Sequence, residues 1–176
     1  MTLEEIFKEL QKQFSTVPLE LVVAKLPAAA GEVAGDSHII VPADKLIEIC
    51  RLLKVSDLFF FDCLSNLTAV DWKDRLEVVY HLFSYRHRQH LELKVKLPVD
   101  NPTVLHPTVP TVESIWKVAN WLEREVFDLF GIIFEGHSDL RRIMLPDDWV
   151  GYPLRKDYKE EEDYHGITTT RPKLLQ

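Results

Sequence analysis

Three histidines close together in the sequence are the first candidates for chemistry. His81, His87 and His90 lie in one short stretch, and imidazole is a common zinc ligand. The pattern places His81 in a strand and the other two in or beside a polar turn, with no cysteine or carboxylate at a recognised ligand spacing. We therefore disfavour a metal site here, and a stand-alone metal-dependent enzyme using His81–His90 stays only as an alternative.

The sequence contains no recognisable binding motif for a redox cofactor. The two cysteines, Cys50 and Cys63, are far apart, whereas iron–sulfur clusters usually need four protein ligands at short spacings. Gly131 and Gly136 follow no predicted strand and precede no Gly-Lys-Ser/Thr, so they fit neither a dinucleotide fingerprint nor a phosphate-binding loop. We expect no cluster, flavin or nicotinamide in this chain.

Paired carboxylates for acid–base catalysis are the next possibility, in WLEREVFDLFG at residues 121–131. Glu123 and Glu125 are two apart, so on a helix they point to different faces. Arg124 and Asp128 are four apart, which predicts an intrahelical ion pair. Because an exposed pair of this kind adds little stability, we interpret these charges as organising an interface.

The densest pattern is GHSDLRRIMLPDDWVGYPLRKDY at residues 136–158, where charges of both signs alternate with large apolar residues. A solvated, mobile terminus would not be expected to expose so much apolar surface, and Arg and Trp are favoured interface anchors. We therefore favour docking to a partner. The residues expected to contact it are Glu123, Arg124, Glu125, Asp128, Gly131, Gly136, His137, Asp139, Arg141, Arg142, Asp148, Trp149, Gly151, Pro153, Leu154, Arg155, Lys156 and Asp157.

The first third of the chain contains the elements that precede this region. Apolar residues at helical spacing from Leu3 to Phe14, with Thr2 and Glu5 as a capping box, predict an amphipathic helix. Residues 19–24 and 38–41 read as strands that could pair as a hairpin across a loop containing Gly31 and Gly35. A second helix is expected from Pro42 to about Leu53.

The middle of the chain predicts a sheet and its strongest helix. The apolar run LFFFDCL (58–64) suggests a central strand buried on both faces. Residues 76–84 and 91–97 should pair antiparallel across a polar turn, because Leu91, Leu93, Val95 and Leu97 alternate with charged residues. Prolines at 98, 102, 107 and 110 then break regular structure, and a helix should run from about Val112 to Phe130, with Gly131 as its stop.

These elements predict an α+β fold, a two-layer sandwich of a mostly antiparallel sheet with helices. We expect one domain over residues 1–134 and an extended, partner-binding C-terminal tail over residues 135–176. The tail has scattered apolar anchors but no periodic face. We therefore expect it to become ordered only against its partners.

The composition disfavours nucleic acid and anionic lipid as partners. The formal charge of −7 gives no basic excess for nucleic acid or for an anionic lipid surface. The acidic N-terminus is unlike a signal peptide, and no apolar run approaches the length of a membrane span. Membrane contact should therefore come only through a partner.

Residues 121–158, together with LTAVDW (67–72), VVYHLFSYR (78–86) and PTVESIWKVANW (110–121), closely resemble the thirty-kilodalton subunit of respiratory complex I. That family's pattern runs through ERE, a DLFG-like turn, GHPDLRRIL and GxPLRKD, and the likeness covers residues 58–158. Ser138 stands where the family usually has proline, and Tyr152 where histidine is common. Loss of the proline should leave that turn less rigid.

The resemblance implies a structural subunit in the peripheral arm of a proton-translocating NADH:quinone oxidoreductase, without a redox centre of its own. Flavin, iron–sulfur clusters and quinone would belong to partner subunits. The implied neighbours are the quinone-site subunit, the terminal-cluster subunit and the ferredoxin-like subunit, at the cytoplasmic face of the inner (plasma) membrane. Equivalent subunits occur in membrane-bound hydrogenases and in ferredoxin- or F420-dependent complexes, so the electron donor stays open.

Overall fold

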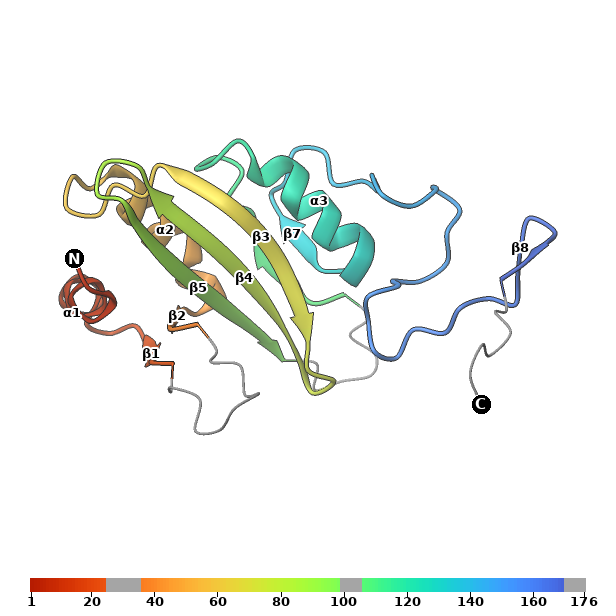
Figure 1. Cartoon of the computed structure of the whole chain (residues 1–176), viewed down its shortest axis with the longest axis horizontal. Helices are drawn as coiled ribbons and strands as arrows, with labels where there is room; N and C mark the ends of the chain where they lie inside the picture. Colours follow the sequence, from red (N-terminus) through yellow and green to blue (C-terminus); the bar gives the residue numbers. More distant parts are fainter. Residues whose placement is uncertain (25–35, 99–105, 170–176) are drawn as a thin grey trace.

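The computed structural model describes residues 1–24, 36–98 and 106–169, so the expected loop with Gly31 and Gly35 and the proline at 102 lie outside the described residues. An N-terminal helix lies at one end of the molecule beside a five-stranded sheet, and the C-terminal segment runs away from the opposite end (Figure 1). We use "C-terminal segment" for residues 136–169. The expected α+β class, with a mostly antiparallel sheet and helices, is confirmed.

The N-terminal elements follow the predictions closely. Helix α1 (Leu3–Gln13) begins with the capping box between Thr2 and Glu5 and buries Ile6 and Leu10. Strands β1 (Glu20–Val22) and β2 (His38–Ile40) pair antiparallel, as expected. A 3₁₀ turn (Ala43–Lys45) leads into α2 (Leu46–Val55), which buries Leu46, Ile49, Cys50 and Leu53.

The sheet has the strand order β1-β2-β5-β4-β3, with β3 (Cys63–Asp71), β4 (Arg75–Ser84) and β5 (Gln89–Pro98) forming an antiparallel meander. The predicted pairing of the last two strands is confirmed, with Leu93 opposite Tyr80. Strand β2 joins β5 in parallel, which makes the sheet mixed. The four alternating apolar residues of β5, which are Leu91, Leu93, Val95 and Leu97, are all buried.

The prediction of a central strand at residues 58–64 is wrong. Strand β3 begins only at Cys63 and lies at the edge of the sheet. Phe59 and Phe61 are fully buried, but they belong to a turn in which Phe60 has a φ of +46°. The apolar run therefore reflects a loop that inserts two aromatic rings into the core, and not a strand covered on both faces.

Helix α3 (Ala119–Phe130) is shorter than expected, because residues 112–118 form turns in which the Val112 carbonyl accepts from Trp116 and Ile115. The indole of Trp116 also donates to the Phe61 carbonyl at 3.1 Å, which fixes these turns to the core. Gly131 ends the helix at φ +70°, as predicted.

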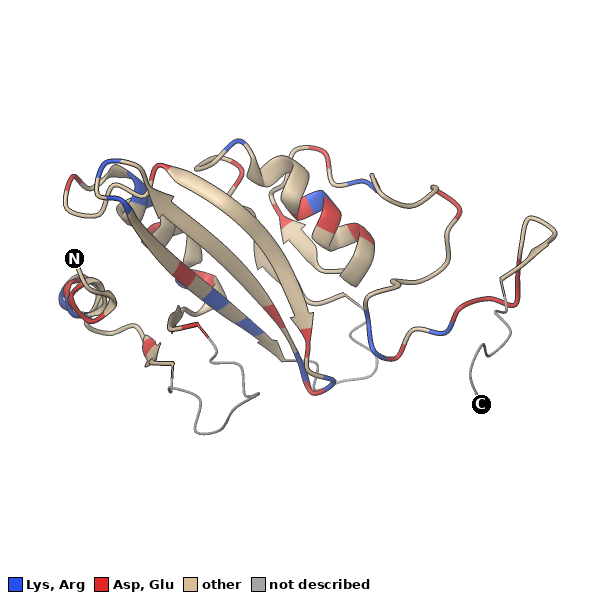
Figure 2. Ribbon diagram, viewed as in Figure 1, with Lys and Arg blue, Asp and Glu red and all other residues tan. Residues whose placement is uncertain are grey.

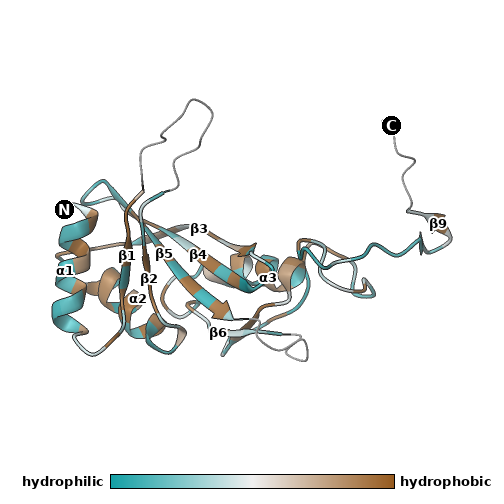
Figure 3. Ribbon diagram, turned by 90° about the horizontal axis from the view of Figure 1, so that it is seen from below, coloured by the Kyte–Doolittle hydropathy of each residue, from teal (hydrophilic) through white to brown (hydrophobic). Residues whose placement is uncertain are grey.

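Helices α2 and α3 cover the same face of the sheet. The hydroxyl of Tyr80, on β4, lies in the core between them, and its pKa is raised first by burial and then by the nearby Glu123 of α3 and Cys50 of α2. Seen from below, the strands and α2 carry many hydrophobic residues, whereas the chain beyond α3 is mostly hydrophilic (Figure 3). The core thus ends at α3 and at the short strand beside it.

Two small sheets complete the fold. Strand β6 (Thr108–Pro110) pairs parallel with β7 (Ile133–Glu135), and β8 (Asp163–Tyr164) pairs with β9 (Ile167–Thr168) in a terminal hairpin. Because β7 ends at Glu135, this strand crosses the expected boundary between residues 134 and 135. The C-terminal segment starts directly after it, at Gly136.

Candidate interaction site

Asp128, in the last turn of α3, fastens the C-terminal segment to the helix. Its fully buried carboxylate accepts hydrogen bonds from the N–H groups of Ile143 (3.0 Å), Met144 (2.7 Å) and Leu145 (2.9 Å). It also forms an ion pair with Arg142 at 2.6 Å. Burial alone would raise the pKa of Asp128, but these donors outweigh it and the pKa is lowered. The carboxylate therefore stays charged and holds the segment in place.

Arg124 forms the second attachment, one helical turn earlier. Its buried guanidinium donates to the carbonyls of Arg141 (3.2 Å) and Arg142 (3.4 Å) and lies 3.9 Å from the Asp139 carboxylate. The predicted Arg124–Asp128 ion pair is therefore wrong. Arg124 and Asp128 instead each bond to backbone groups of the C-terminal segment, which lies along the helix.

In Figure 2, basic and acidic positions lie next to each other along α3, and further positions of both signs follow along the C-terminal segment. Within the single chain, the backbone of residues 141–145 is bonded to α3. For the rest of the tail, order supplied by a partner stays a prediction.

Tyr152 organises the turn that follows. Its ring lies against Gly131, where a Cβ atom would come within 2.5 Å of the ring, and this close approach excludes any larger residue at the end of α3. The guanidinium groups of Arg142 and Arg155 stack on the ring at 5.3 and 5.0 Å. Arg155 also donates to the Phe130 carbonyl at 2.5 Å, so the turn at residues 151–155 is bound to the C-terminal end of α3.

Glu123 is buried under the segment in an environment that favours its neutral form. Its carboxyl group accepts from the Thr111 hydroxyl (2.5 Å) and the Val112 N–H (2.8 Å) and lies 4.0 Å from His137. His137 lies with Nε2 3.0 Å from the Asn120 carbonyl oxygen and accepts the Asp139 N–H at Nδ1, so each ring nitrogen has a backbone partner other than Glu123. Burial therefore dominates and raises the pKa of Glu123 to about 7.

Glu123→Gln is expected to flatten the dependence of stability on pH. The folded pKa of about 7 exceeds the ordinary value of 4.5, so the folded chain holds more protons between these values and its stability falls as the pH rises through them. The loss is about 3 kcal/mol. Urea unfolding at pH 5 and pH 8 should show a smaller difference for Glu123→Gln than for the natural chain or the control Glu125→Gln. An equal difference in all three would contradict the buried, protonated carboxyl.

Ser138 holds its turn by hydrogen bonds, where the related family usually has proline. Its N–H and its hydroxyl both donate to the Glu113 carboxylate, at 3.0 and 2.7 Å. These bonds, the N–H first, lower the pKa of Glu113 to about 2. Proline could supply neither donor, so the rigidity lost with its ring is replaced by a bonded carboxylate.

A separate cluster lies further along the segment, around the β8–β9 hairpin. Asp148 accepts from the Tyr164 hydroxyl (2.9 Å) and contacts His165 (2.6 Å), and Trp149 stacks on the Tyr164 ring. The bonds from Tyr164 and His165 lower the pKa of Asp148. Asp148 and Trp149 therefore hold the hairpin and lie apart from the α3 group.

The structure places most of the predicted site residues around α3, at the terminal hairpin or beside the β3–β4 turn, and leaves five of them elsewhere. Those around α3 are Glu123, Arg124, Asp128, Gly131, His137, Asp139, Arg142, Gly151 and Arg155. Lys156 and Asp157 line a cavity beside the β3–β4 turn. Arg141 and Leu154 are exposed, Gly136 makes a turn at φ +83°, and Glu125 and Pro153 are half-buried.

Six contributing residues were missed from the sequence: Thr111, Glu113, Asn120, Ser138, Tyr152 and Asp71. Most of their partners lie far along the chain, so no local spacing could have signalled them.

The histidines that opened the question of a metal site have other contacts. His90 stacks on Phe83, and His87 contacts the Asp57 carbonyl at 3.0 Å. Across residues 1–24, 36–98 and 106–169, no three His, Cys, Asp or Glu side chains are grouped so that they could hold a metal ion. Over the same ranges, no helix has the length and apolar character needed to cross a lipid bilayer.

Known proteins resemble this chain over most of its length. Residues 39–164 match the family described as "Respiratory-chain NADH dehydrogenase, 30 Kd subunit". The corresponding NADH-quinone oxidoreductase subunit of Roseiflexus sp. is 42% identical over 79% of this chain and 80% of its own length, and that of Geobacter sulfurreducens is 41% identical over 77% and 84%.

A solved structure is also similar, that of the membrane-bound sulfane sulfur reductase, an archaeal respiratory membrane complex. One of its chains has a TM-score of 0.66 and 31% identity, covering 89% of this chain and 85% of its own. With the family match spanning residues 39–164 and these relatives covered over most of their length, the chain belongs to the family of the 30 Kd subunit of respiratory-chain NADH dehydrogenase, the NADH-quinone oxidoreductase of the respiratory chain.

Proposed function

We propose that this chain is a cofactor-free structural element of the peripheral arm of a proton-translocating NADH:quinone oxidoreductase. It packs against the quinone-site subunit, the terminal-cluster subunit and the ferredoxin-like subunit, at the cytoplasmic face of the plasma membrane. The chain helps to set the geometry of its partners, and electrons pass through the flavin, clusters and quinone that those partners hold.

One observation carries the proposal. The C-terminal segment is bonded to α3 through its backbone, yet it leaves large apolar side chains in solvent: Met144 is 60% exposed, Val150 62% and Leu154 52%. Trp121, on the exposed face of α3, is 63% exposed. Apolar side chains held in fixed positions in water are typical of a surface that a partner covers.

A second candidate differs only in the electron chemistry of the assembled complex. The similar archaeal complex is a sulfane sulfur reductase, so subunits of this shape also serve complexes other than NADH:quinone oxidoreductases. The two candidates differ in their other subunits. A co-purified flavin subunit with a nicotinamide site supports the first, and its absence from an otherwise intact complex supports the second.

The test is assembly in native membranes. The chain with an N-terminal affinity tag is expected to co-purify with subunits of the three named kinds in mild detergent, as identified by mass spectrometry. The double variant Met144→Asp/Leu154→Asp should retain at least about tenfold less of these subunits, because assembly would bury two carboxylates without cationic partners. The melting temperature of the variant chain itself should stay unchanged, because both positions are exposed.

Val55→Asp is the matched control, because Val55 is 73% exposed at the end of α2, outside the C-terminal segment. This variant should assemble like the natural chain. Full assembly of the double variant would show that the docking surface does not include Met144 and Leu154. If the tagged natural chain co-purifies with no partner subunits, the proposal is overturned.

A further inference from the structure

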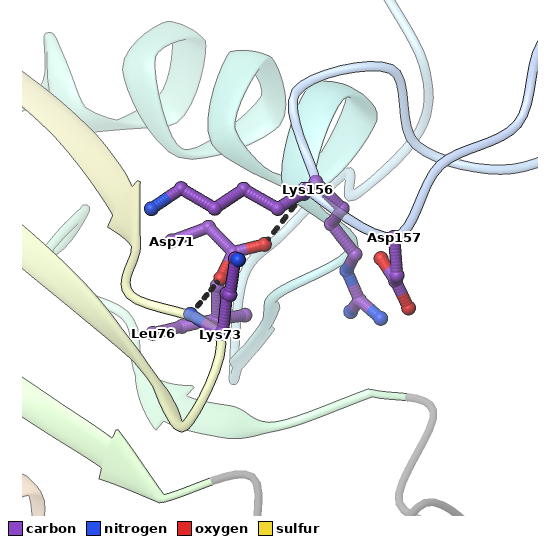
Figure 4. Close-up of a pocket in the computed structure, with 6 residues that line it drawn as sticks. Asp71, Lys73, Leu76, Lys156 and Asp157 are labelled. Atoms are coloured by element: carbon purple, nitrogen blue, oxygen red, sulfur yellow. Dashed lines mark hydrogen bonds between the residues drawn. The ribbon is translucent and has the colours of Figure 1, made fainter.

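A cavity of about 250 Å³ lies between the turn that joins β3 to β4 and the turn at residues 155–157 (Figure 4). Its lining comes from two stretches far apart in the sequence: Asp71, Lys73 and Leu76 on one side, and Arg155, Lys156 and Asp157 on the other.

The walls of this cavity are fixed before any ligand arrives. Asp71 accepts the Lys73 N–H at 2.6 Å and the Lys156 N–H at 2.7 Å, so one carboxylate ties the two walls together. Lys73 is held at φ +75°, a conformation that is uncommon for a side chain of this size. Arg155 is anchored to the Phe130 carbonyl. The cavity is therefore preorganised, which lowers the entropic cost of binding.

The charges around the cavity favour an anion. Among the described residues, the lining has the ammonium groups of Lys73 and Lys156, the guanidinium of Arg155 and the carboxylates of Asp71 and Asp157. Arg155 already donates to the Phe130 and Gly131 carbonyls, and Asp71 accepts two backbone N–H groups, so the two lysines are the groups that would bind an incoming anion. Asp157 remains as a second negative charge, which would repel a doubly charged phosphate more strongly than a carboxylate with a single charge.

Size and the neighbouring surface indicate where the carboxylate comes from. Pockets for small molecules usually enclose about 300–1,000 Å³, so this one suits one or two protein side chains. Trp72 lies beside it with Lys156 at 5.8 Å and Arg75 at 5.3 Å from its ring, and yet it is 48% exposed. An exposed, oriented indole next to a cationic cavity is typical of an anchor for a polypeptide.

We infer that this cavity receives a glutamate or aspartate side chain from an extended segment of a partner subunit, with Lys73 and Lys156 binding the carboxylate and Trp72 packing on the flanking residues. The inference rests on the proposed function, because it needs an assembled complex. The cavity would give the partner an additional contact at the β3–β4 turn, where strand β3 ends and strand β4 begins.

Carbodiimide cross-linking of the purified native complex is the direct test, since it joins a lysine amine to a carboxylate only when the two are in contact. Mass spectrometry should find Lys73 or Lys156 coupled to a Glu or Asp of a partner subunit. If both lysines couple only to carboxylates of their own chain while the partner subunits are present, this inference fails and the proposed function stands. If no partner subunits co-purify, both fail.

Two variants test the inference independently, with the amount of partner subunits retained at 0.3 M salt as the measurement. Lys73→Asp is tolerated by the turn, because Asp adopts a positive φ more readily, and Lys156→Gln keeps the N–H bond to Asp71. Each should retain about threefold less partner than the natural chain, and Lys159→Glu, an exposed control in the same segment, should not. Equal retention in all four chains would overturn the inference.

Discussion

Asp128→Ala is expected to release residues 142–145 from α3 and to lower the free energy of unfolding by about 3–5 kcal/mol. The buried carboxylate has four donors, three of them backbone N–H groups and the fourth the guanidinium of Arg142. Alanine leaves the three N–H groups unpaired and Arg142 without its carboxylate, and the cost of an unpaired buried donor exceeds the net gain from making the bond. The large effect arises because one side chain serves so many partners.

Limited trypsin digestion of the free chain measures this release. In the natural chain, cleavage after Arg141 and Arg142 should be slow, because Arg124 binds both carbonyls and Asp128 holds the next three N–H groups. Asp128→Ala should be cut there rapidly. Asp139→Ala is the control, since that carboxylate is half exposed and serves mainly Arg141. Equal cleavage of all three chains would contradict the fastening role.

The same contacts change what is expected of Arg142. From the sequence alone, its truncation should weaken only the assembly of the complex and leave the melting of the free chain unchanged. In the structure, Arg142 pairs with Asp128 at 2.6 Å and donates to the Gly151 carbonyl at 3.1 Å. Truncation would therefore destabilise the chain itself, and Arg142 is a poor probe of the interface, whereas the exposed Met144 and Leu154 are suitable ones.

Local patterns explain which parts of the fold could be predicted. The β4–β5 hairpin could be predicted from the alternation along the ten-residue strand β5, and α1 from a capping box within its first turn, so short stretches of sequence contain the whole signal. The run at residues 58–64 contains no such signal, because hydrophobicity alone does not separate a buried strand from a buried turn. The positive φ at Phe60 depends on packing against the rest of the core.

The spacing of the predicted site residues does not show which bonds they form. The spacing of Arg124 and Asp128 suggested a pair, whereas both side chains bond to backbone fifteen or so residues further along the chain. Glu123 gave no sign of its burial, because its hydrogen-bond partner Thr111 lies twelve residues away in a separate turn. Contacts of this kind are set by how the C-terminal segment lies on α3, which no periodicity in the sequence records.

Leu93→Asp is expected to unfold the domain or to cost more than about 4 kcal/mol. Leu93 is fully buried at the centre of the sheet, between Tyr80 on β4 and Ile39 on β2. A carboxylate there would lose its hydration without gaining a cationic partner, because its cross-strand neighbours on both sides are buried core residues. Protonation would reduce the penalty, but it would still leave a polar group in an apolar core.

Lys96→Asp tests whether position, and not the new charge, causes this loss. Lys96 lies on the same strand, with an exposed side chain that pairs only with Glu20 at 3.3 Å among the contacts of the described residues. Losing an exposed ion pair costs no more than about 1 kcal/mol, so this variant should stay folded. Urea unfolding followed by circular dichroism compares the two. Since a register slip by one residue would exchange the two faces of β5, equal stability of both variants would contradict the pairing of Leu93 with Tyr80.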